Sequence, residues 1–254
     1  MNDQRRLYHD LAWVWPIISP PQEYVEETGR LCAIIREYSL IEARTLLHLG
    51  CGGGHQDYTL KKHFRVTGVD VSESMLELAR GLNPEVIYLL GDMRTLRLEQ
   101  SFDAVTLLDS VNYMVTAEDL RAAFATAFAH LKPGGVFVTI AELTRESFQQ
   151  NWTCSSTHVR GDIEVAFIEN HYDRDPGDTS CEVTFVYLIR RAGELKTEID
   201  RHLCGVFPLD TWKSALKETG FEVSRKELTY LIPRDSDAQS YNMFVCVKPL
   251  APPG

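Results

Sequence analysis

The chain has 254 residues, is 44% apolar and carries a formal net charge of −10 at pH 7. That length and apolar content can bury one sizeable core, while the excess of acidic groups argues against nucleic-acid partners, whose phosphates are bound mainly by lysine and arginine. No stretch approaches the roughly 20 apolar residues of a membrane span. The six cysteines show neither a C-x-x-C pair nor metal-ligand spacing. We therefore expect a soluble cytoplasmic protein with no bound metal, no membrane contact and no nucleic-acid partner.

The first 143 residues predict an α/β arrangement. An aromatic segment over 8–17 precedes Pro20-Pro21, which open a helix that runs to Tyr38. Strands and helices then alternate: strand 45–50, helix to 63, strand 65–71, helix 72–80, strands 86–91 and 102–109, helix 117–131 and strand 135–143. Alternation of this kind implies a parallel sheet with helices on both faces.

The pattern changes after Glu142. Three segments, 161–172, 180–191 and 194–205, alternate apolar and polar residues, which is typical of antiparallel strands with one face in water. We expect an inserted antiparallel β-meander over the active site, followed by a helix over 209–219 and an antiparallel hairpin of 221–230 with 242–248. The prediction is one domain, 1–254, with an N-terminal segment (1–40), a core (41–143), the meander (155–206) and a return to the core (207–248).

The most informative stretch is the glycine-rich loop after the first strand. The strand leads into Gly50-Cys51-Gly52-Gly53-Gly54-His55, and such a tight turn needs glycine because glycine adopts positive φ and lets the backbone approach a ligand. The next strand ends at Asp70, 20 residues after Gly50, where a carboxylate can accept hydrogen bonds from both hydroxyls of a ribose. A dinucleotide fingerprint would need a third glycine where His55 stands. The loop therefore predicts a nucleoside ligand and argues against a nicotinamide enzyme.

The loop resembles the G-x-G-x-G motif of the class I S-adenosylmethionine-dependent methyltransferases. Three further stretches follow in that family's order: Gly91-Asp92-Met93, the strand 101–109, and the turn Leu131-Lys132-Pro133-Gly134-Gly135. Membership implies a Rossmann-like seven-stranded sheet, mostly parallel with one antiparallel closing hairpin, and S-adenosyl-L-methionine as cofactor. The residues assigned to that cofactor are Tyr24, Gly50, Cys51, Gly52, Gly53, His55, Asp70, Val71, Met75, Gly91, Asp92, Met93, Leu108 and Asp109.

Within that family, the chain more loosely resembles the amino-sugar N,N-dimethyltransferases. The likeness rests on the aromatic N-terminal segment, on a first helix that opens near Gln22-Glu23-Tyr24, and on the meander between the fifth strand and the last helix. In that group an N-terminal tyrosine approaches the cofactor or the amine, and by position this is Tyr8 or Tyr24. The alternative for both is a helix-packing tyrosine whose hydroxyl lies in water.

One position departs from the family pattern. Most members carry an acid two residues before the first loop glycine, where this chain has His48. We interpret His48 as a structural hydrogen-bonding group at the end of a strand. The alternative is a site that holds the positively charged cofactor more weakly or that is adapted to a different ligand.

Other residues are expected to line the acceptor. A sulfonium methyl is transferred by in-line attack, so the protein mainly aligns and desolvates the acceptor, and an amine or hydroxyl must also lose a proton. We expect Asp109 and Tyr113 to line the acceptor pocket, with Asn112 beside them. The candidate bases are Asp109 and the histidines of the meander: His158, His171 and His202. Each has a structural alternative, such as capping a turn or facing solvent.

The sequence thus predicts an enzyme that transfers a methyl group from S-adenosyl-L-methionine to nitrogen or oxygen of a small-molecule acceptor. The alternative is a regulator or scaffold that binds the cofactor without transferring its methyl group, which the histidine at position 48 keeps open. A nicotinamide enzyme is a third class, which would bind neither S-adenosylmethionine nor S-adenosylhomocysteine. The acceptor, the number of methyl groups added and the formation of a homodimer are left open by the sequence.

Overall fold

A seven-stranded sheet forms the centre of the molecule. The computed structural model describes residues 5–230 and 239–250. The strands of this sheet are β1 (Thr45–Leu49), β2 (Arg65–Asp70), β3 (Ile87–Leu90), β4 (Phe102–Leu107), β5 (Leu131–Ala141), β10 (Glu222–Tyr230) and β11 (Gln239–Val247). Their order is β10-β11-β5-β4-β1-β2-β3, in which β1 to β5 are parallel, β11 is antiparallel to β5, and β10 is antiparallel to β11. The predicted sheet and its closing hairpin are confirmed. Residues 1–4, 231–238 and 251–254, which the predicted domain includes, lie outside the residues that the structure describes.

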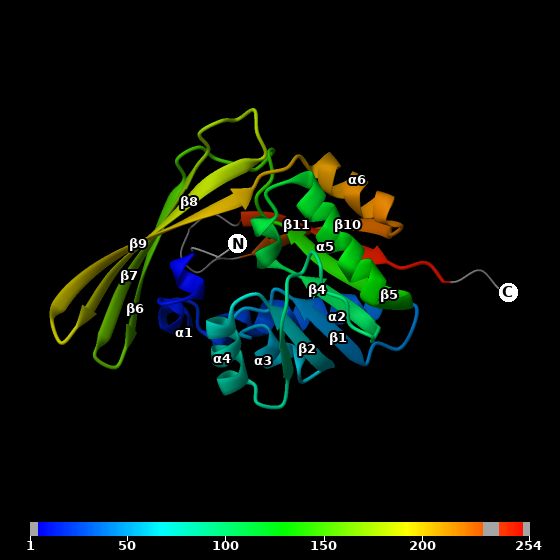
Figure 1. Ribbon diagram of the computed structural model, residues 1–254, viewed down its shortest axis with the longest axis horizontal. Helices are drawn as coiled ribbons and strands as arrows, with labels where there is room; N and C mark the ends of the chain where they lie inside the picture. The colour runs from blue at the N-terminus through cyan, green and yellow to red at the C-terminus, as the bar shows by residue number, and fades with distance from the viewer. Residues whose placement is uncertain (1–4, 231–238, 251–254) are drawn as a thin grey trace.

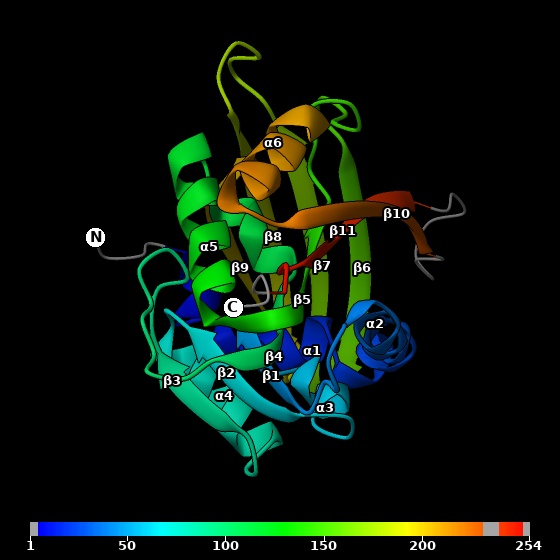
Figure 2. The ribbon, with the colours of Figure 1, turned by 90° about the vertical axis from the view of Figure 1, so that its right-hand side faces the viewer.

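Helices cover both faces of this sheet. They are α2 (Val25–Tyr38), α3 (Asp57–Leu60), α4 (Glu73–Leu82), α5 (Ala117–His130) and α6 (Leu209–Thr219). Apolar side chains of α5 and α6, such as Phe124 and Trp212, pack on one face with Phe137 and Phe244 of the sheet, and those of α2, α3 and α4 pack on the other. Figure 2 shows α5 and α6 lying together on the side away from α2. Burial of these two apolar clusters is the main stabilising contribution to the fold.

A second, antiparallel sheet stands beside the first (Figure 1). It has four strands in the order β6-β7-β8-β9: β6 (Thr153–Arg160), β7 (Ile163–Tyr172), β8 (Ser180–Arg191) and β9 (Glu194–Gly205). The predicted meander had three strands and began at 155, so β6 corrects that prediction. Most residues of β6 are polar, and none of its side chains is fully buried. The strand therefore has no alternation of apolar and polar residues that could be detected in the sequence.

The N-terminal segment joins the two sheets. It consists of η1 (Arg6–Tyr8), η2 (Ala12–Val14), α1 (Trp15–Ile18) and η3 (Pro21–Tyr24). Leu7, Val14 and Ile18 from this segment pack in one buried cluster with Tyr187 of β8 and Met75 of α4. Figure 1 shows the segment between the four-stranded sheet and α4. The aromatic stretch that had no clear period in the sequence is therefore a packed connection made of short helical turns.

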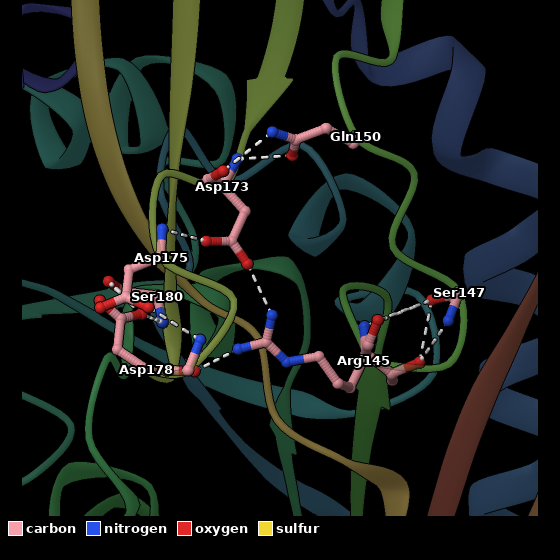
Figure 3. Close-up of polar contacts among 9 residues, drawn as sticks. Arg145, Ser147, Gln150, Asp173, Asp175, Asp178 and Ser180 are labelled. Carbon is pink, nitrogen blue, oxygen red and sulfur yellow. Dashed lines mark hydrogen bonds and ion pairs between the residues drawn. The ribbon is translucent and has the colours of Figure 1, made fainter.

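An arginine fastens the connection between β5 and β6 to the turn between β7 and β8 (Figure 3). Arg145 Nη1 donates to Asp173 Oδ2 at 2.6 Å, and Nη2 donates to the carbonyl oxygen of Asp178. The other oxygen of Asp173 accepts from the backbone N–H of Asp175, and the Gln150 amide bonds both the N–H and the carbonyl of Asp173. These contacts fix one end of the small sheet relative to the strands that carry the site.

Several predicted elements end earlier than expected, and two of these differences lie next to the site. The helix expected to reach residue 63 is the four-residue α3, because hydrogen bonds from Thr59 N to Gln56 O and from Lys62 N to Thr59 O close tighter turns around it. The strand expected to reach Asp109 ends at Leu107, and Asp109 instead begins η4 (Asp109–Tyr113). Val111 and Met114 of this segment pack in the buried cluster on the sheet, while Asp109 is exposed.

Candidate active site

The glycine loop follows β1 and takes up left-handed backbone angles. Gly50 has a φ of +67° and Gly52 a φ of +51°, a region that side chains other than glycine adopt at a cost. A Cβ on Gly50 would lie 1.9 Å from Ser110 Oγ, whereas a Cβ on Gly52 would have no atom within 4 Å. The loop is therefore packed against η4 at Gly50 and open to a ligand at Gly52.

Asp70, at the end of β2, holds this loop. Its Oδ2 accepts from Gly52 N at 2.8 Å and its Oδ1 from Ser72 N at 2.9 Å. Ser72 Oγ in turn accepts from Met75 N and caps α4, as its position in the sequence predicts. Burial raises the pKa of Asp70, against the opposing effect of the two backbone hydrogen bonds. Because a carboxylate offers about four lone-pair sites, two remain for the hydroxyls of a ribose.

A network of buried, hydrogen-bonded side chains holds the glycine loop. His48 Nδ1 lies 2.7 Å from Asp57 Oδ1, and the Tyr88 hydroxyl donates to Asp57 Oδ2 at 2.9 Å. Asn83 Nδ2 donates to the carbonyl of Gly54 at 2.8 Å. The interpretation of His48 as a structural hydrogen-bonding group is confirmed. Where most members of the family carry an acid on the first strand, this chain has His48, and the neighbouring carboxylate comes from Asp57 of α3.

Aromatic rings cover the end of the loop. The rings of Trp15 and His55 are stacked, with centroids 5.7 Å apart and planes 16° apart, and Tyr24 lies 6.1 Å from His55. Burial lowers the pKa of His55 to about 4, so the imidazole is neutral near pH 7. Trp15 was not among the expected site residues. In the sequence, only its aromatic side chain marked Trp15 as a candidate, because the segment around it shows no regular period.

The loop after β3 presents the expected Gly91-Asp92-Met93. Arg94 holds the Asp92 carboxylate through its backbone N–H and its guanidinium, and the side-chain hydrogen bond from Arg94 lowers the pKa of Asp92. The remaining expected contacts differ in exposure. Val71 is exposed, Met93 and Leu108 are buried at the sheet, and Met75 is buried under the N-terminal segment.

Two carboxylates lie at the ends of β4 and β5. Asp109 is the first residue of η4, and Glu142 follows β5 and accepts from Asn112 Nδ2 at 2.7 Å. Burial raises the pKa of both carboxyl groups, and the charge of Asp109 raises that of Glu142 further. Asp109 is accessible to solvent at the same time, which is the situation of a group deep in an open crevice. Glu142 was missed, although it directly follows the end of a parallel strand, as Asp70 ends β2.

Tyr113 links the core to the four-stranded sheet. Its hydroxyl lies 2.5 Å from that of Tyr8 and 2.8 Å from Nδ1 of His202, whose Nε2 lies 2.8 Å from Asp200 Oδ2. The other two candidate histidines bond elsewhere: His158 to Ser156 Oγ and His171 to Glu169 Oε1. Of the three, His202 is the one that the structure joins to Tyr113.

These groups share one edge of the sheet. The loop after β1, Asp70 at the end of β2, Asp109 after β4 and Glu142 after β5 all lie at the carboxyl ends of parallel strands. The order of the strands reverses between β1 and β4, and ligands of such sheets bind in the crevice at that point. Over residues 5–230 and 239–250 there is no group of three or more metal-ligating side chains and no helix long and apolar enough to cross a bilayer.

Comparisons with known proteins place this site in a family. A family described as "Methyltransferase domain" matches residues 46–135. A dTDP-3-amino-3,4,6-trideoxy-alpha-D-glucopyranose N,N-dimethyltransferase of Streptomyces venezuelae is 32% identical over 208 residues, which cover 81% of this chain and 86% of the relative. A dTDP-3-amino-3,6-dideoxy-alpha-D-glucopyranose N,N-dimethyltransferase of Streptomyces fradiae is 28% identical, with 80% and 79% covered.

Solved structures agree with this assignment. Streptomyces venezuelae DesVI superposes with a TM-score of 0.80 at 27% identity and covers 94% of this chain and 96% of its own. The amino pentose methyltransferase CalS10 of Micromonospora echinaspora, solved with bound S-adenosylmethionine, gives a TM-score of 0.76 at 28% identity, with 89% and 91% covered. The matched family and these relatives show that the chain belongs to the S-adenosylmethionine-dependent methyltransferases that act on small molecules.

Proposed function

We propose that the acceptor is the amino group of a nucleotide-linked amino sugar and that the enzyme adds one or two methyl groups to it. Three relatives whose names describe N,N-dimethyltransferases of dTDP-amino sugars align with about four-fifths of the chain (81%, 80% and 78%). The observation that carries the proposal is the junction of Tyr8, Tyr113 and His202, through which the four-stranded sheet reaches the edge that holds Asp70 and Asp109. An acceptor bound there lies between the two sheets.

The residues at the crevice fit the cofactor. We assign the methionine end to the backbone of the loop at Gly52, where a Cβ would fill open space, the ribose to Asp70, and the adenine to the segment around Asp92. Tyr24 and His55 border the loop. When bound, S-adenosylmethionine supplies a methyl group on a positively charged sulfur.

The chain's own contribution is alignment and exclusion of water. Tyr8 and Tyr113 offer hydroxyls that can orient an amine, and holding two reactants in line contributes roughly 7–11 kcal/mol to such reactions. Asp109 and Glu142 place two carboxyl groups at this edge, whose oxygens can accept hydrogen bonds from an acceptor that carries an amino group.

Turnover tests the proposal directly. The purified protein is incubated with S-adenosylmethionine and a panel of dTDP-3-amino sugars, aliphatic amines and phenols, and the products are identified by mass spectrometry. We expect methylation of the amino sugars and none of the phenols. Methylation of phenols alone would refute an amine acceptor, and cofactor binding without turnover on any acceptor would favour the regulator or scaffold.

Two further expectations belong to this proposal. The six cysteines are free of disulfides, which supports a reducing compartment such as the cytoplasm, and the net negative charge supports a small acceptor over a nucleic acid. A homodimer is expected at the face of β9 that exposes Leu195, Ile199 and Leu203. Sedimentation velocity on the intact chain and on an Ile199→Lys variant tests it, and an unchanged sedimentation coefficient would argue against that face.

A further inference from the structure

A chain of hydrogen-bonded side chains runs from the four-stranded sheet to the acceptor edge. It begins at Asp200 and His202 on β9, passes through the Tyr113 hydroxyl on η4, and ends at the Tyr8 hydroxyl on η1. The successive distances are 2.8, 2.8 and 2.5 Å. Three segments far apart in the sequence therefore contribute to one continuous connection.

The inner end of this chain is buried and fixed. His202 is 1% exposed and Asp200 is 3% exposed, and Asp200 Oδ2 also accepts from Leu7 N at 2.7 Å. The ring of Phe185 meets the imidazole edge-on, with centroids 4.6 Å apart. The outer end is different, because Tyr8 and Tyr113 both keep solvent-accessible surface.

The carboxylate sets the direction of the hydrogen bonds. Burial works to raise the pKa of Asp200, but the hydrogen bonds from His202 and Leu7 outweigh it and the pKa lies below its usual range. An ionised carboxylate only accepts, so Nε2 of His202 donates to it, and Nδ1, the other ring nitrogen, is placed to accept from the Tyr113 hydroxyl. Because Tyr113 has one proton, its oxygen accepts from Tyr8. The Tyr8 oxygen is left with free lone pairs at the end of the chain.

The backbone of Tyr8 lies beside the cofactor edge. Ser72 Oγ donates to the carbonyl oxygen of Tyr8, and Ser72 N donates to Asp70. The carboxylate of Asp70 is also close enough to raise the pKa of the Tyr8 phenol, in addition to the larger effect of burial. The free end of the chain thus lies on the side of the crevice where we place the ribose.

We propose that this chain orients the acceptor amine and removes its proton, with His202 as the terminal proton acceptor. The inference rests on the proposed function. The acceptor nitrogen forms a bond to the methyl carbon while the carbon–sulfur bond breaks and its electron pair stays on sulfur. The proton that the nitrogen then loses passes to the Tyr8 oxygen, the Tyr8 proton to Tyr113, and the Tyr113 proton to Nδ1 of His202, whose positive charge Asp200 offsets.

Protonation of His202 before the reaction reverses the chain. With both ring nitrogens donating, Tyr113 accepts from Nδ1 and the Tyr8 hydroxyl turns its proton toward the amine. The amine lone pair is then held in a hydrogen bond and turnover falls. The titratable groups that contact the imidazole are Asp200 on β9, Tyr113 on η4 and Tyr8 on η1. Arg5 lies over the rings of Tyr8 and Tyr113. Cys204 on β9 acts electrostatically on Tyr113, and Asp200 acts on Tyr187 of β8.

The kinetic test uses His202→Asn, Tyr113→Phe and their double variant. The asparagine oxygen can replace Nδ1 as an acceptor but cannot take up a proton, and phenylalanine keeps the ring of Tyr113. We expect each single variant to lower kcat about a hundredfold, to lose the acidic limb of the kcat–pH profile, and to bind S-adenosylhomocysteine as the wild type does. The double variant is expected to be no slower than the slower single variant, because both break one path.

A matched control and a second readout complete the design. His158→Asn changes another histidine of the same sheet, one bonded to Ser156, and is expected to keep the wild-type kcat and pH profile. Nitrogen-15 spectra of the ligand-free protein report the tautomer: we expect Nε2 of His202 protonated, Nδ1 bare, and the Nδ1 signal shifted by Tyr113→Phe.

Two results would overturn the inference. One is a kinetic result: His202→Asn keeps the wild-type kcat and pH profile, or the reduction of kcat in the double variant equals the product of the reductions in the two single variants. The other is a spectrum in which Nδ1 carries the proton. A wild-type enzyme that methylates no amine would instead refute the proposed function, and the spectra would then show separately whether the chain has the stated direction.

Discussion

Replacement of Asp70 by alanine removes the group on which cofactor binding is most dependent. The carboxylate accepts from Gly52 N and Ser72 N, which leaves about two lone-pair sites for the ribose hydroxyls. A hydrogen bond to a charged group contributes about 1.5–3 kcal/mol, so the loss of two is worth at least about 3 kcal/mol. Because about 1.4 kcal/mol is tenfold in affinity, the Kd for S-adenosylmethionine should rise more than about a hundredfold.

Titration calorimetry with S-adenosylmethionine and S-adenosylhomocysteine measures this effect. Glu73→Gln is the matched control, because Glu73 is an acid three residues further along that pairs with Arg80 at the surface, and its Kd should equal that of the wild type. Thermal unfolding checks that the loop of Asp70→Ala remains folded. A folded Asp70→Ala protein whose Kd stays near the wild-type value would show that the ribose does not lie on this carboxylate.

Three further predictions concern turnover, pH and stability. Asp109→Asn should lower kcat and leave cofactor affinity nearly unchanged, and an equal loss of both would assign Asp109 to the cofactor or to structure. Burial and Asp109 raise the pKa of Glu142, so the folded protein loses stability as the pH rises through that pKa. Glu142→Gln should therefore raise Tm at about pH 8 and leave it nearly unchanged at about pH 4, where the carboxyl is protonated in both states; a gain that is equal at both pH values would contradict this. Arg145→Met leaves Asp173, whose side chain is 2% exposed, without its ion pair and should cost about 3 kcal/mol of unfolding free energy. Arg174→Met, which breaks a pair at a side chain that is 73% exposed, should cost less than about 1 kcal/mol in the same denaturant titration, and equal costs would refute the reasoning.

The parts that sequence predicted well are those that local chemistry determines. The loop around Gly50 and Gly52 needs positive φ, and Asp70 follows an apolar strand at a fixed spacing, so neighbouring residues alone indicate both. The cap of α4 at Ser72 and the end of α6 at Gly220, with a φ of +106°, are local in the same sense. Nothing distant in the chain was needed to recognise them.

The parts that were missed depend on contacts between distant segments. Tyr113 and His202 are 89 positions apart, and three histidines of the meander were equally good candidates until the sheet register placed one beside the tyrosine. Glu142 directly follows β5, but no motif marks it. Trp15 stacks on His55 through a segment with no regular period. Strand β6 is polar along its length and has no apolar pattern to detect.

A crystal structure with S-adenosylhomocysteine and a dTDP-3-amino sugar would show where the ribose and the amine bind. We expect the ribose hydroxyls on Asp70, the sulfur facing the hydroxyls of Tyr8 and Tyr113, and the sugar amine within hydrogen-bonding distance of the Tyr8 oxygen. A ribose bound away from Asp70, or a sugar amine on the far side of the four-stranded sheet from Tyr8, would contradict this expectation.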